Sequence, residues 1–388
     1  MRSADNPYSP GAGNPPPELA GREDILERAS GILERTLNKR MTKSMMMLGL
    51  RGVGKTVLLN RVQQMADDAG CVTGFMEAEG RQALPNLLAP HLRRILLKLD
   101  TQELARESVH RALRLLRGFA SAFSVKFGGI EVAVTPEVVT GDLSLDLTDL
   151  FVAVGEAAVK RDTPVVILID EVQYLSSDEL GAVMVALHRV SQRQLPLLFL
   201  GAGLPQLAGL AGEAKSYAER LFAFDEIGRL EDAAARQAIT VPLTQEGADI
   251  DDDAVDAILA ETDCYPFFLQ VWGHYAWESA EISPISLEDV NLATVKSIED
   301  LDRGFFKVRY QRLSDRQRDY AFALARLGPE PATSQAVARG LGISVEQAAP
   351  VRSGIIRKGL AYSPNRGLVA FTVPKFDEYL RRVEVSRE

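Results

Sequence analysis

The sequence has little cysteine and no long hydrophobic run. Its 388 residues include only two cysteines, Cys71 and Cys264, which lie 193 residues apart. Two distant thiols supply neither the disulfide framework of a small secreted domain nor the paired ligands of a zinc site. No apolar run approaches the roughly 18 residues that a membrane-spanning helix needs. The first residues, Met1–Pro7, also lack the apolar core of a signal peptide. We therefore expect a cytoplasmic protein.

An excess of positive charge is also missing. The chain has 44 Lys and Arg against 53 Asp and Glu, a net charge of −9, which argues against a protein that coats nucleic acid over its whole surface. The segment from Tyr310 to Glu388 is the exception, because it carries 13 Lys and Arg against 8 Asp and Glu. A basic tail on an acidic body predicts an anionic partner for the tail. The length predicts two or three domains.

The clearest motif runs from Met45 to Thr56 and reads MMMLGLRGVGKT. An apolar strand, a glycine-rich loop and a helix start follow one another, and Gly49 with Gly54-Lys55-Thr56 completes the phosphate-loop pattern. The loop glycines let consecutive backbone N–H groups face a phosphate, and the helix adds the positive end of its dipole. Lys55 is expected to reach the β- and γ-phosphates, and the Thr56 hydroxyl to ligate Mg²⁺. The predicted nucleotide contacts in this motif are Gly49, Arg51, Gly52, Val53, Gly54, Lys55, Thr56 and Val57.

A glycine-rich turn before a helix can arise by chance, but a second motif argues against that interpretation. Residues 165–169 read VVILI, a continuous apolar run that predicts a buried parallel strand. The run ends in Asp170 and Glu171, at the strand end where ligands bind in open α/β sheets. We expect Asp170 to hold magnesium through water and Glu171 to polarise the attacking water. Together the motifs predict an α/β P-loop domain with a parallel sheet that binds a nucleoside triphosphate.

The segments around these motifs give weaker signals. Residues 1–17 are rich in Pro, Gly, Asn and Ser, which predicts a disordered or extended lead. The 115 residues from Lys55 to Asp170 leave room for an insertion at about 84–147. Its first part has a helical pattern, and residues 121–134 alternate around a Gly-Gly pair, which predicts a hairpin. We interpret this hairpin as a covering edge of the sheet rather than as a partner contact.

The tail has a different organisation. Residues 334–344 predict a helix, a glycine turn and a helix cap, a second helix follows, and residues 359–373 predict two strands around Asn-Arg-Gly. A helix–turn–helix followed by a β-hairpin is the order of a winged helix. The predicted DNA contacts, whose side chains can neutralise phosphates, are Arg352, Arg357, Lys358 and Arg366.

The second tail helix also has features that argue against DNA. It begins with Glu346 and is poor in the Asn, Gln and Arg side chains that read bases. Winged helices also serve as protein–protein modules, so a protein-facing tail remains the alternative.

Over about residues 15–385, these motifs resemble a bacterial or archaeal AAA+ ATPase of the origin-recognition or STAND type. The resemblance implies ATP rather than another nucleotide, a site between core and lid, and a winged helix that rearranges with nucleotide state. It divides the chain into a lead, a P-loop core, a helical lid and a winged helix at 1–17, 18–228, 229–305 and 306–388.

The resemblance implies two further nucleotide contacts. Arg22, in the run Gly21-Arg22-Glu23, matches a segment that contacts adenine in such proteins, although a solvated helix start explains it equally well. Pro266 matches the lid proline motif, which packs by the adenine, but Cys264 stands where a glycine is usual.

The resemblance also bears on hydrolysis. Arg220 precedes an apolar strand, where an arginine can reach a neighbouring subunit's nucleotide; a surface pair with Glu219 or Asp225 is the alternative. The strand at 195–203 ends in Gly-Ala-Gly, whereas such proteins usually offer a polar residue there to orient water. This departure implies slow hydrolysis and a switch rather than a motor.

The sequence therefore supports two functions of different classes. The first is an ATP- and Mg²⁺-dependent switch, with possible self-association, whose winged helix engages duplex DNA. The alternative is a signalling or defence ATPase whose winged helix binds a protein partner. A metabolic kinase is less well supported, because no acceptor pocket is evident and the tail would be unexplained.

Overall fold

The computed structural model describes residues 1–11, 13–80, 82–100, 106–125 and 139–385. The chain divides into two compact units. The first, here called the sheet unit, comprises Asp24–Gly49 and Lys55–Glu226. The second, here called the C-terminal unit, comprises Met1–Glu23, Leu50–Gly54 and Ile227–Glu388. None of the described helices is long and apolar enough to cross a membrane.

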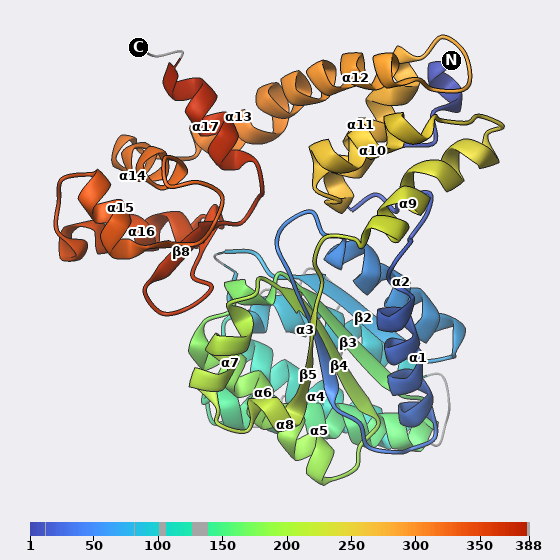
Figure 1. The fold of residues 1–388 in the computed structure, drawn as a ribbon. Coiled ribbons are helices and arrows are strands. Elements are labelled where there is room, and N and C mark those ends of the chain that lie inside the picture. Colours follow the sequence, from blue (N-terminus) through green and yellow to red (C-terminus); the bar gives the residue numbers. More distant parts are fainter. Residues whose placement is uncertain (12, 81, 101–105, 126–138, 386–388) are drawn as a thin grey trace. The chain divides into compact units, whose positions relative to one another are not determined.

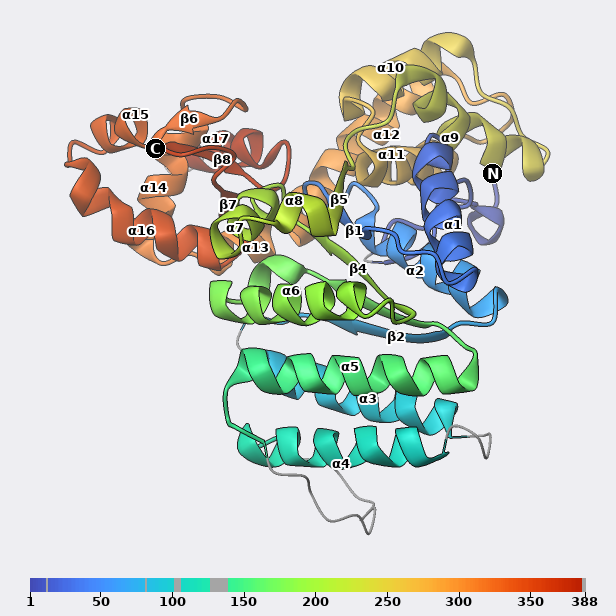
Figure 2. The ribbon, with the colours of Figure 1, turned by 90° about the horizontal axis from the view of Figure 1, so that it is seen from below.

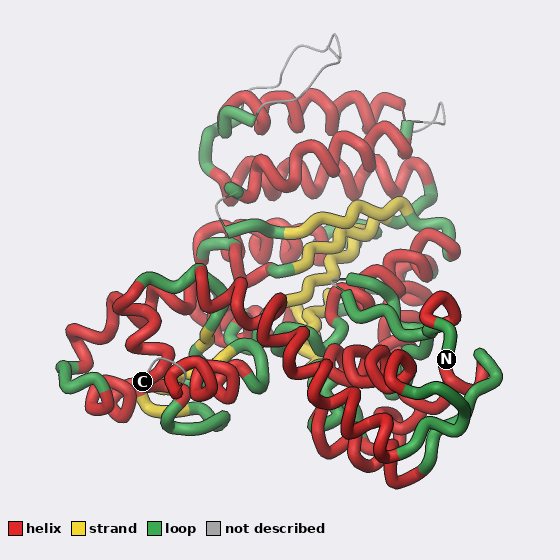
Figure 3. The backbone as a smooth tube through the Cα atoms, turned by 90° about the horizontal axis from the view of Figure 1, so that it is seen from above, coloured by secondary structure: helices red, strands yellow, loops and turns green. Residues whose placement is uncertain are grey.

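A five-stranded parallel sheet organises the sheet unit, in the order β2-β3-β4-β1-β5 (Figure 1). Every residue of β1, β3 and β4 is buried, which is why these strands are continuous apolar runs in the sequence. The strands are β1 (Ser44–Leu48), β2 (Val72–Glu77), β3 (Val165–Asp170), β4 (Leu197–Gly203) and β5 (Phe222–Glu226). They form the longer yellow layer in Figure 3.

Helices cover this sheet, and the insertion adds a further layer. Figure 2 shows α4 as the outermost helix, lying on α3 and α5. A serine and a glutamate form a capping box at the start of α6, and Asp142 caps α5 by accepting from two backbone N–H groups. The helices are α1 (Glu23–Leu37), α2 (Lys55–Asp68), α3 (Leu84–Leu99), α4 (Arg106–Ala122), α5 (Leu143–Arg161), α6 (Ser177–Gln192), α7 (Leu207–Ala214) and α8 (Ala218–Leu221), with a short 3₁₀ helix η3 (Val172–Tyr174).

The predicted hairpin differs from the structure where it can be compared. Ser121 and Ala122 end helix α4 instead of starting a strand. Phe123 then packs against Phe119, with ring centroids 4.9 Å apart. The apolar alternation at 121–125 is therefore the end of a buried helix face rather than a strand pattern. The rest of the predicted hairpin, residues 126–134, lies outside the described residues.

Helices make up most of the C-terminal unit. Its first part holds η1 (Ser3–Asp5), α9 (Asp232–Gln245), α10 (Asp252–Thr262), α11 (Pro266–Ser279) and α12 (Leu287–Asp300). The π-helical η4 (Leu301–Phe306) and α13 (Lys307–Gln311) continue directly from α12. The domain boundary predicted at 305–306 therefore falls inside a continuous helical segment.

The predicted helix–turn–helix and hairpin order is present at the end of this unit. A small antiparallel sheet has the strand order β6-β8-β7. The elements are α14 (Asp315–Ala325), β6 (Ala332–Thr333), α15 (Ser334–Gly340), α16 (Val345–Arg357), β7 (Ala361–Tyr362), β8 (Leu368–Phe371) and α17 (Phe376–Val385).

The first part of the N-terminal lead is packed, so of the two predicted forms, disordered or extended, the disordered one is wrong there. Tyr8 is only 3% exposed, and its hydroxyl donates to the carbonyl oxygen of Ile239 in α9. Its ring lies against Gly273, where an added Cβ would come within 2.7 Å of ring carbons. The Trp277 indole N–H donates to the Arg2 carbonyl oxygen at 2.8 Å. A composition rich in Pro and Gly did not reveal that a single aromatic side chain fits a gap made by a glycine.

Candidate nucleotide-binding site

The glycine-rich loop lies where the motif predicts, between β1 and α2. Gly52 and Gly54 have φ angles of +90° and +93°, which residues other than glycine rarely adopt. The Gly49 N–H donates to the carbonyl oxygen of Gly203 at 3.0 Å, which anchors the start of the loop to the end of β4. Lys55 is buried at the first position of α2. The local backbone is therefore that of a phosphate-binding loop.

The structure brings together the two residues predicted to hold magnesium. The hydroxyl of Thr56, on the second residue of α2, donates to a carboxylate oxygen of Asp170. Asp170 ends β3 and is 2% exposed. A hydroxyl oxygen and a buried carboxylate are the hard oxygen donors that Mg²⁺ prefers. This donor pair fits the metal that the motif implies.

Glu171 has an unusual backbone. Its φ of +54° lies in the left-handed region, which non-glycine residues rarely adopt and which is common at functional sites. Its N–H donates to Asp170 Oδ1 at 2.7 Å, and its carboxylate accepts a hydrogen bond from the Gln173 amide. The backbone turn therefore directs the two neighbouring carboxylates to different partners.

Gln173 is a site residue that sequence reasoning missed. It lies on η3, and its amide oxygen accepts from the Leu204 N–H at 3.0 Å while its nitrogen donates to Glu171. A Cβ added at Gly203 would meet this amide oxygen at 2.7 Å. The polar group beside the end of β4 thus comes from Gln173 instead of from the strand. The sequence signal that could have identified Gln173 is a side-chain amide two residues after Glu171.

Gly201 has a packing reason of its own. A Cβ added there would lie 2.4 Å from the Met46 sulfur on β1. The glycine therefore allows β4 and β1 to pair closely, with Met46 opposite Gly201 in the register. A polar side chain at this position would displace a core methionine.

Arg22 lies against the loop, within the C-terminal unit. Its guanidinium donates to the carbonyl oxygens of Val53, at 3.3 Å, and Gly228. The side chain is 8% exposed, and burial lowers its pKa, with Glu23 acting in the opposite direction. This geometry differs from a solvated helix start, because the arginine joins the loop backbone to Gly228.

The segment that resembles the lid proline motif contacts the loop through the residues on either side of Pro266. Tyr265 donates its hydroxyl to the Arg51 carbonyl oxygen, and the Phe267 N–H donates to the Gly52 carbonyl oxygen at 3.2 Å. A Cβ at Gly52 would come within 3.0 Å of Phe267 and 3.2 Å of Tyr265. Sequence reasoning selected the proline, which begins α11, but missed both aromatic residues.

Cys264 occupies a backbone position that explains the glycine usual in the related motif. Its φ is +54°, and that of the preceding Asp263 is +48°. The thiol is 6% exposed, and burial is the main cause that raises its pKa to about 11. It is therefore protonated at neutral pH, and its S–H donates to an Asp232 carboxylate oxygen at 3.6 Å.

The remaining predicted residues lie away from these contacts in different ways. Arg220 is exposed on α8. Among the described residues it forms an ion pair with neither Glu219 nor Asp225, the two partners suggested from the sequence, and Asp225 pairs with Arg28 instead. In the tail, Arg352 donates to Ser363 and to the Leu368 carbonyl oxygen, both at 2.8 Å.

Two of the four predicted DNA contacts are therefore engaged inside their own domain. Besides Arg352, Lys358 donates to the Gln317 amide oxygen at 2.6 Å and to the Arg312 carbonyl oxygen. Arg357 and Arg366 are exposed.

Comparisons with known proteins agree with this geometry. Residues 18–200 match the family model described as AAA ATPase domain, and residues 303–380 match a domain of unknown function, DUF8462. The chain is similar in structure to a Walker-type ATPase of Pyrococcus abyssi, with a TM-score of 0.55 and 17% identity over 95% of this chain and 98% of that one. No curated protein matches the chain.

Two further solved structures have lower TM-scores. The ORC1 protein of Aeropyrum pernix in complex with DNA has a TM-score of 0.45 and 16% identity, over 95% of this chain and 94% of that one. The RuvB Holliday junction branch migration motor of Thermotoga maritima has a TM-score of 0.44 and 15% identity, over 94% and 95%.

The fold prediction is confirmed, since the parallel sheet and its helices match those of P-loop NTPases.

Proposed function

We propose that this protein is an ATP- and Mg²⁺-dependent switch of the STAND or origin-recognition type, which hydrolyses ATP slowly and engages DNA through a winged helix. The observation that carries the nucleotide part is the hydrogen bond from Thr56 to Asp170, next to the glycine-rich loop. It joins the two nucleotide motifs, which lie 114 residues apart in the sequence.

In this proposal the loop N–H groups and Lys55 bind the phosphates, and Thr56 and Asp170 hold the metal. Bound Mg²⁺ would neutralise phosphate charge and orient the terminal phosphate. Glu171 accepts a hydrogen bond from the attacking water and orients it. Gln173 holds the Glu171 carboxylate to the end of β4, so it is a positioning residue in this scheme.

Slow hydrolysis is supported by the end of β4. It offers Gly201, Ala202 and Gly203, none of which has a polar side chain. A site with no strand-borne polar group to orient water suits a timed switch.

Contacts of the loop support the switching part. Within the C-terminal unit, the backbone of residues 51–53 bonds to Arg22, Tyr265, Phe267 and Thr372. Phosphates that reorganise the loop would favour one set of these contacts over another. A ligand shifts such an equilibrium only by its differential affinity for the two arrangements.

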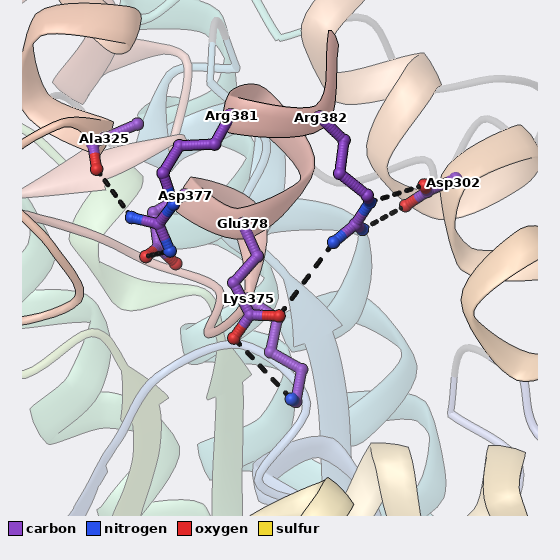
Figure 4. A network of polar contacts seen from close by, with 7 residues as sticks. All are labelled: Asp302, Ala325, Lys375, Asp377, Glu378, Arg381 and Arg382. Atoms are coloured by element: carbon purple, nitrogen blue, oxygen red, sulfur yellow. Dashed lines mark hydrogen bonds and ion pairs between the residues drawn. The ribbon is translucent and has the colours of Figure 1, made fainter. Parts of the chain in front are cut away.

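The last helix, α17, is bonded to η4 and to the end of α14 (Figure 4). Arg382 on α17 makes two bonds to Asp302 on η4, at 2.7 and 3.0 Å. Arg381 bonds to the Ala325 carbonyl oxygen at 2.7 Å and pairs with Asp377 at 2.8 Å. Movement of η4 would therefore be transmitted to α14 and α17.

DNA engagement is supported by the basic tail and by the exposed guanidinium groups of Arg357 and Arg366. The alternative, a protein partner, is favoured by the start of α16. Ile343 and Val345 are each 38% exposed there, and Glu346 is the neighbouring charged residue. An apolar and acidic helix start suits a protein surface better than a phosphate backbone.

Duplex-DNA binding by the full chain decides between DNA and a protein partner. It is measured at several salt concentrations, with ADP, with a non-hydrolysable ATP analogue and with neither. We expect binding that depends on nucleotide and falls as salt rises. Absence of binding in every state would contradict the DNA part and favour the protein partner.

Self-association through Arg220 is tested separately, because Arg220→Ala should lower ATPase activity only at concentrations where the protein assembles.

A further inference from the structure

A basic surface on the insertion has no role in the proposed function. Helices α3 and α4 together carry seven Lys and Arg against one acidic residue, Glu107, although the net charge of the chain is −9. Figure 2 shows α4 as the outermost helix, and its buried apolar residues pack on α3 and α5. Five of the seven basic side chains are exposed. The insertion is therefore a positively charged part of an acidic protein.

Four of these cations follow the two helices at intervals of whole turns. Arg94 and Lys98 on α3 are four residues apart, and like charges at that spacing repel each other. Arg106 and Arg114 on α4 are about two turns apart, or about 12 Å along the axis. Among the described residues, none of the four forms an ion pair. These four side chains, here called the basic face, would be stabilised by an anionic surface.

The opposite charge is concentrated on the C-terminal unit. Residues 246–263 contain eight Asp and Glu and no Lys or Arg. Asp252 and Asp253 are the first two residues of α10, and both are exposed. Asp253 lies one turn before Asp256, on the same side of the helix.

A groove between α9 and α10 lies beside these aspartates. Its volume is about 390 Å³, within the range of ligand pockets. Its two arginines are already paired, since Arg236 bonds to Asp252 at 3.3 Å and also to Asp256, and Arg229 bonds to Asp263 at 2.5 Å. The groove, with Asp252 and Asp253 at its edge, is here called the acidic groove, and it keeps an excess of negative charge. The charged and thiol residues that line it are Arg229, Asp232, Arg236, Asp256, Asp263 and Cys264.

We propose that the basic face of one copy of this chain docks on the acidic groove of a second copy. Charge complementarity assigns the occupant, because every copy supplies both surfaces. Duplex nucleic acid would compensate only the basic face and would be repelled by the acidic groove. A contact between two copies compensates both surfaces at once.

The contact joins two different surfaces, so it is head-to-tail. Such contacts close into a ring or extend into a filament. The inference goes beyond the proposed function, because the contact needs neither nucleotide nor DNA. It uses no residue of the glycine-rich loop, and Arg220 belongs to neither surface.

The test measures the average mass of the nucleotide-free full chain by sedimentation at several protein concentrations. We expect the mass of the wild type to rise with concentration at about 0.1 M salt and to fall toward that of the monomer near 1 M. Between these two conditions the Debye length shortens from about 10 to about 3 Å, so the attraction between the two surfaces is screened.

Two double variants replace attraction by repulsion. Lys98→Glu with Arg106→Glu changes the basic face, and Asp252→Lys with Asp253→Lys changes the acidic groove. Each variant alone should associate about tenfold or more weakly than the wild type, because like charges then meet at the contact. An equal mixture of the two should associate more strongly than either, since the new glutamates of one variant meet the new lysines of the other. Recovery in the mixture also shows that both variants are folded.

The matched control is Arg40→Glu with Lys160→Glu. Both side chains are exposed on the sheet unit and lie outside the basic face, and the change in net charge equals that of Lys98→Glu with Arg106→Glu. The control should associate as the wild type does. Lys55→Ala should also associate normally, so a failure of the proposed nucleotide site and a failure of this contact are distinguishable.

Three results would overturn the inference. The first is a wild type that stays monomeric at both salt concentrations. The second is wild-type association in either double variant, and the third is a mixture that associates no better than its components. Loss of duplex-DNA binding in Lys98→Glu with Arg106→Glu, with self-association unchanged, would assign the basic face to nucleic acid instead.

Discussion

The backbone N–H of Arg51 donates a hydrogen bond to the carbonyl oxygen of Thr372 at 3.1 Å. Arg51 belongs to the glycine-rich loop, and Thr372 directly follows the last strand of the tail domain. Thr372 is fully buried, and its hydroxyl donates to the Gly359 carbonyl oxygen at 2.8 Å. The residue that contacts the loop is therefore fixed within its own domain, which gives the loop a rigid contact in the tail.

The first prediction concerns Lys55. Lys55→Ala should abolish tight ATP binding, because the loop loses the ammonium group expected to reach the β- and γ-phosphates. A loss of about 1.5–3 kcal/mol corresponds to roughly 10- to 150-fold in affinity. Calorimetric titration measures it. Lys43→Ala is the matched control, since Lys43 is on the surface and its ammonium bonds to the Glu219 carbonyl oxygen. Unchanged affinity in Lys55→Ala would rule out the phosphate-loop assignment.

Glu171→Gln separates binding from hydrolysis. The amide keeps the size of the side chain but cannot polarise water, so ATP should bind at near wild-type affinity and hydrolysis should fall about 10²- to 10⁴-fold. Phosphate release under saturating ATP measures the rate. Hydrolysis at the wild-type rate would remove Glu171 from the water-polarising role.

Gln173→Leu tests the positioning of Glu171. The variant loses the amide that holds the carboxylate and leaves the Leu204 N–H without its partner, which should lower stability by about 1–3 kcal/mol. Under conditions where it stays folded, kcat should fall while KM does not change, because only the orientation of Glu171 is altered. A change confined to KM would place Gln173 in nucleotide binding instead.

The sequence was sufficient for features that depend on local pattern. Strands β1 and β3 are continuous apolar runs, and the glycine spacing around Lys55 requires the loop backbone that is observed, with φ near +90° at Gly52 and Gly54. The order of helices and short strands in the tail also follows from local turn signals. These features need no knowledge of distant contacts.

Features that depend on distant contacts were not predictable. Tyr8 is buried only because Gly273, 265 residues later, leaves room for its ring. Arg352 has the sequence character of a DNA contact, yet Ser363 and the Leu368 carbonyl oxygen bind it. A single sequence shows which side chains can bind an anion, but not which of them the fold has already engaged.

Within the tail, Arg352 is already engaged by the fold, whereas Arg357 is exposed. Arg352→Ala should lower the stability of the tail domain by about 1–3 kcal/mol, because a half-buried guanidinium with two hydrogen bonds is lost. Arg357→Ala should leave stability within about 0.5 kcal/mol, because Arg357 is exposed on the same helix. Urea unfolding of both variants measures the difference.

DNA binding by the same pair should show the reverse order. If the tail contacts duplex DNA, Arg357→Ala and Arg366→Ala should each weaken binding across all sequences and reduce the slope of log K against log salt by about one, since each removes one phosphate contact. Arg352→Ala should leave that slope unchanged while it stays folded, because its guanidinium is engaged within the domain. A reduced slope in Arg352→Ala alone would mean that the domain opens on DNA. A wild-type slope in all three variants would contradict phosphate contact through this face. Ile343 and Val345, at the start of α16, would then be the surface to test for a protein partner.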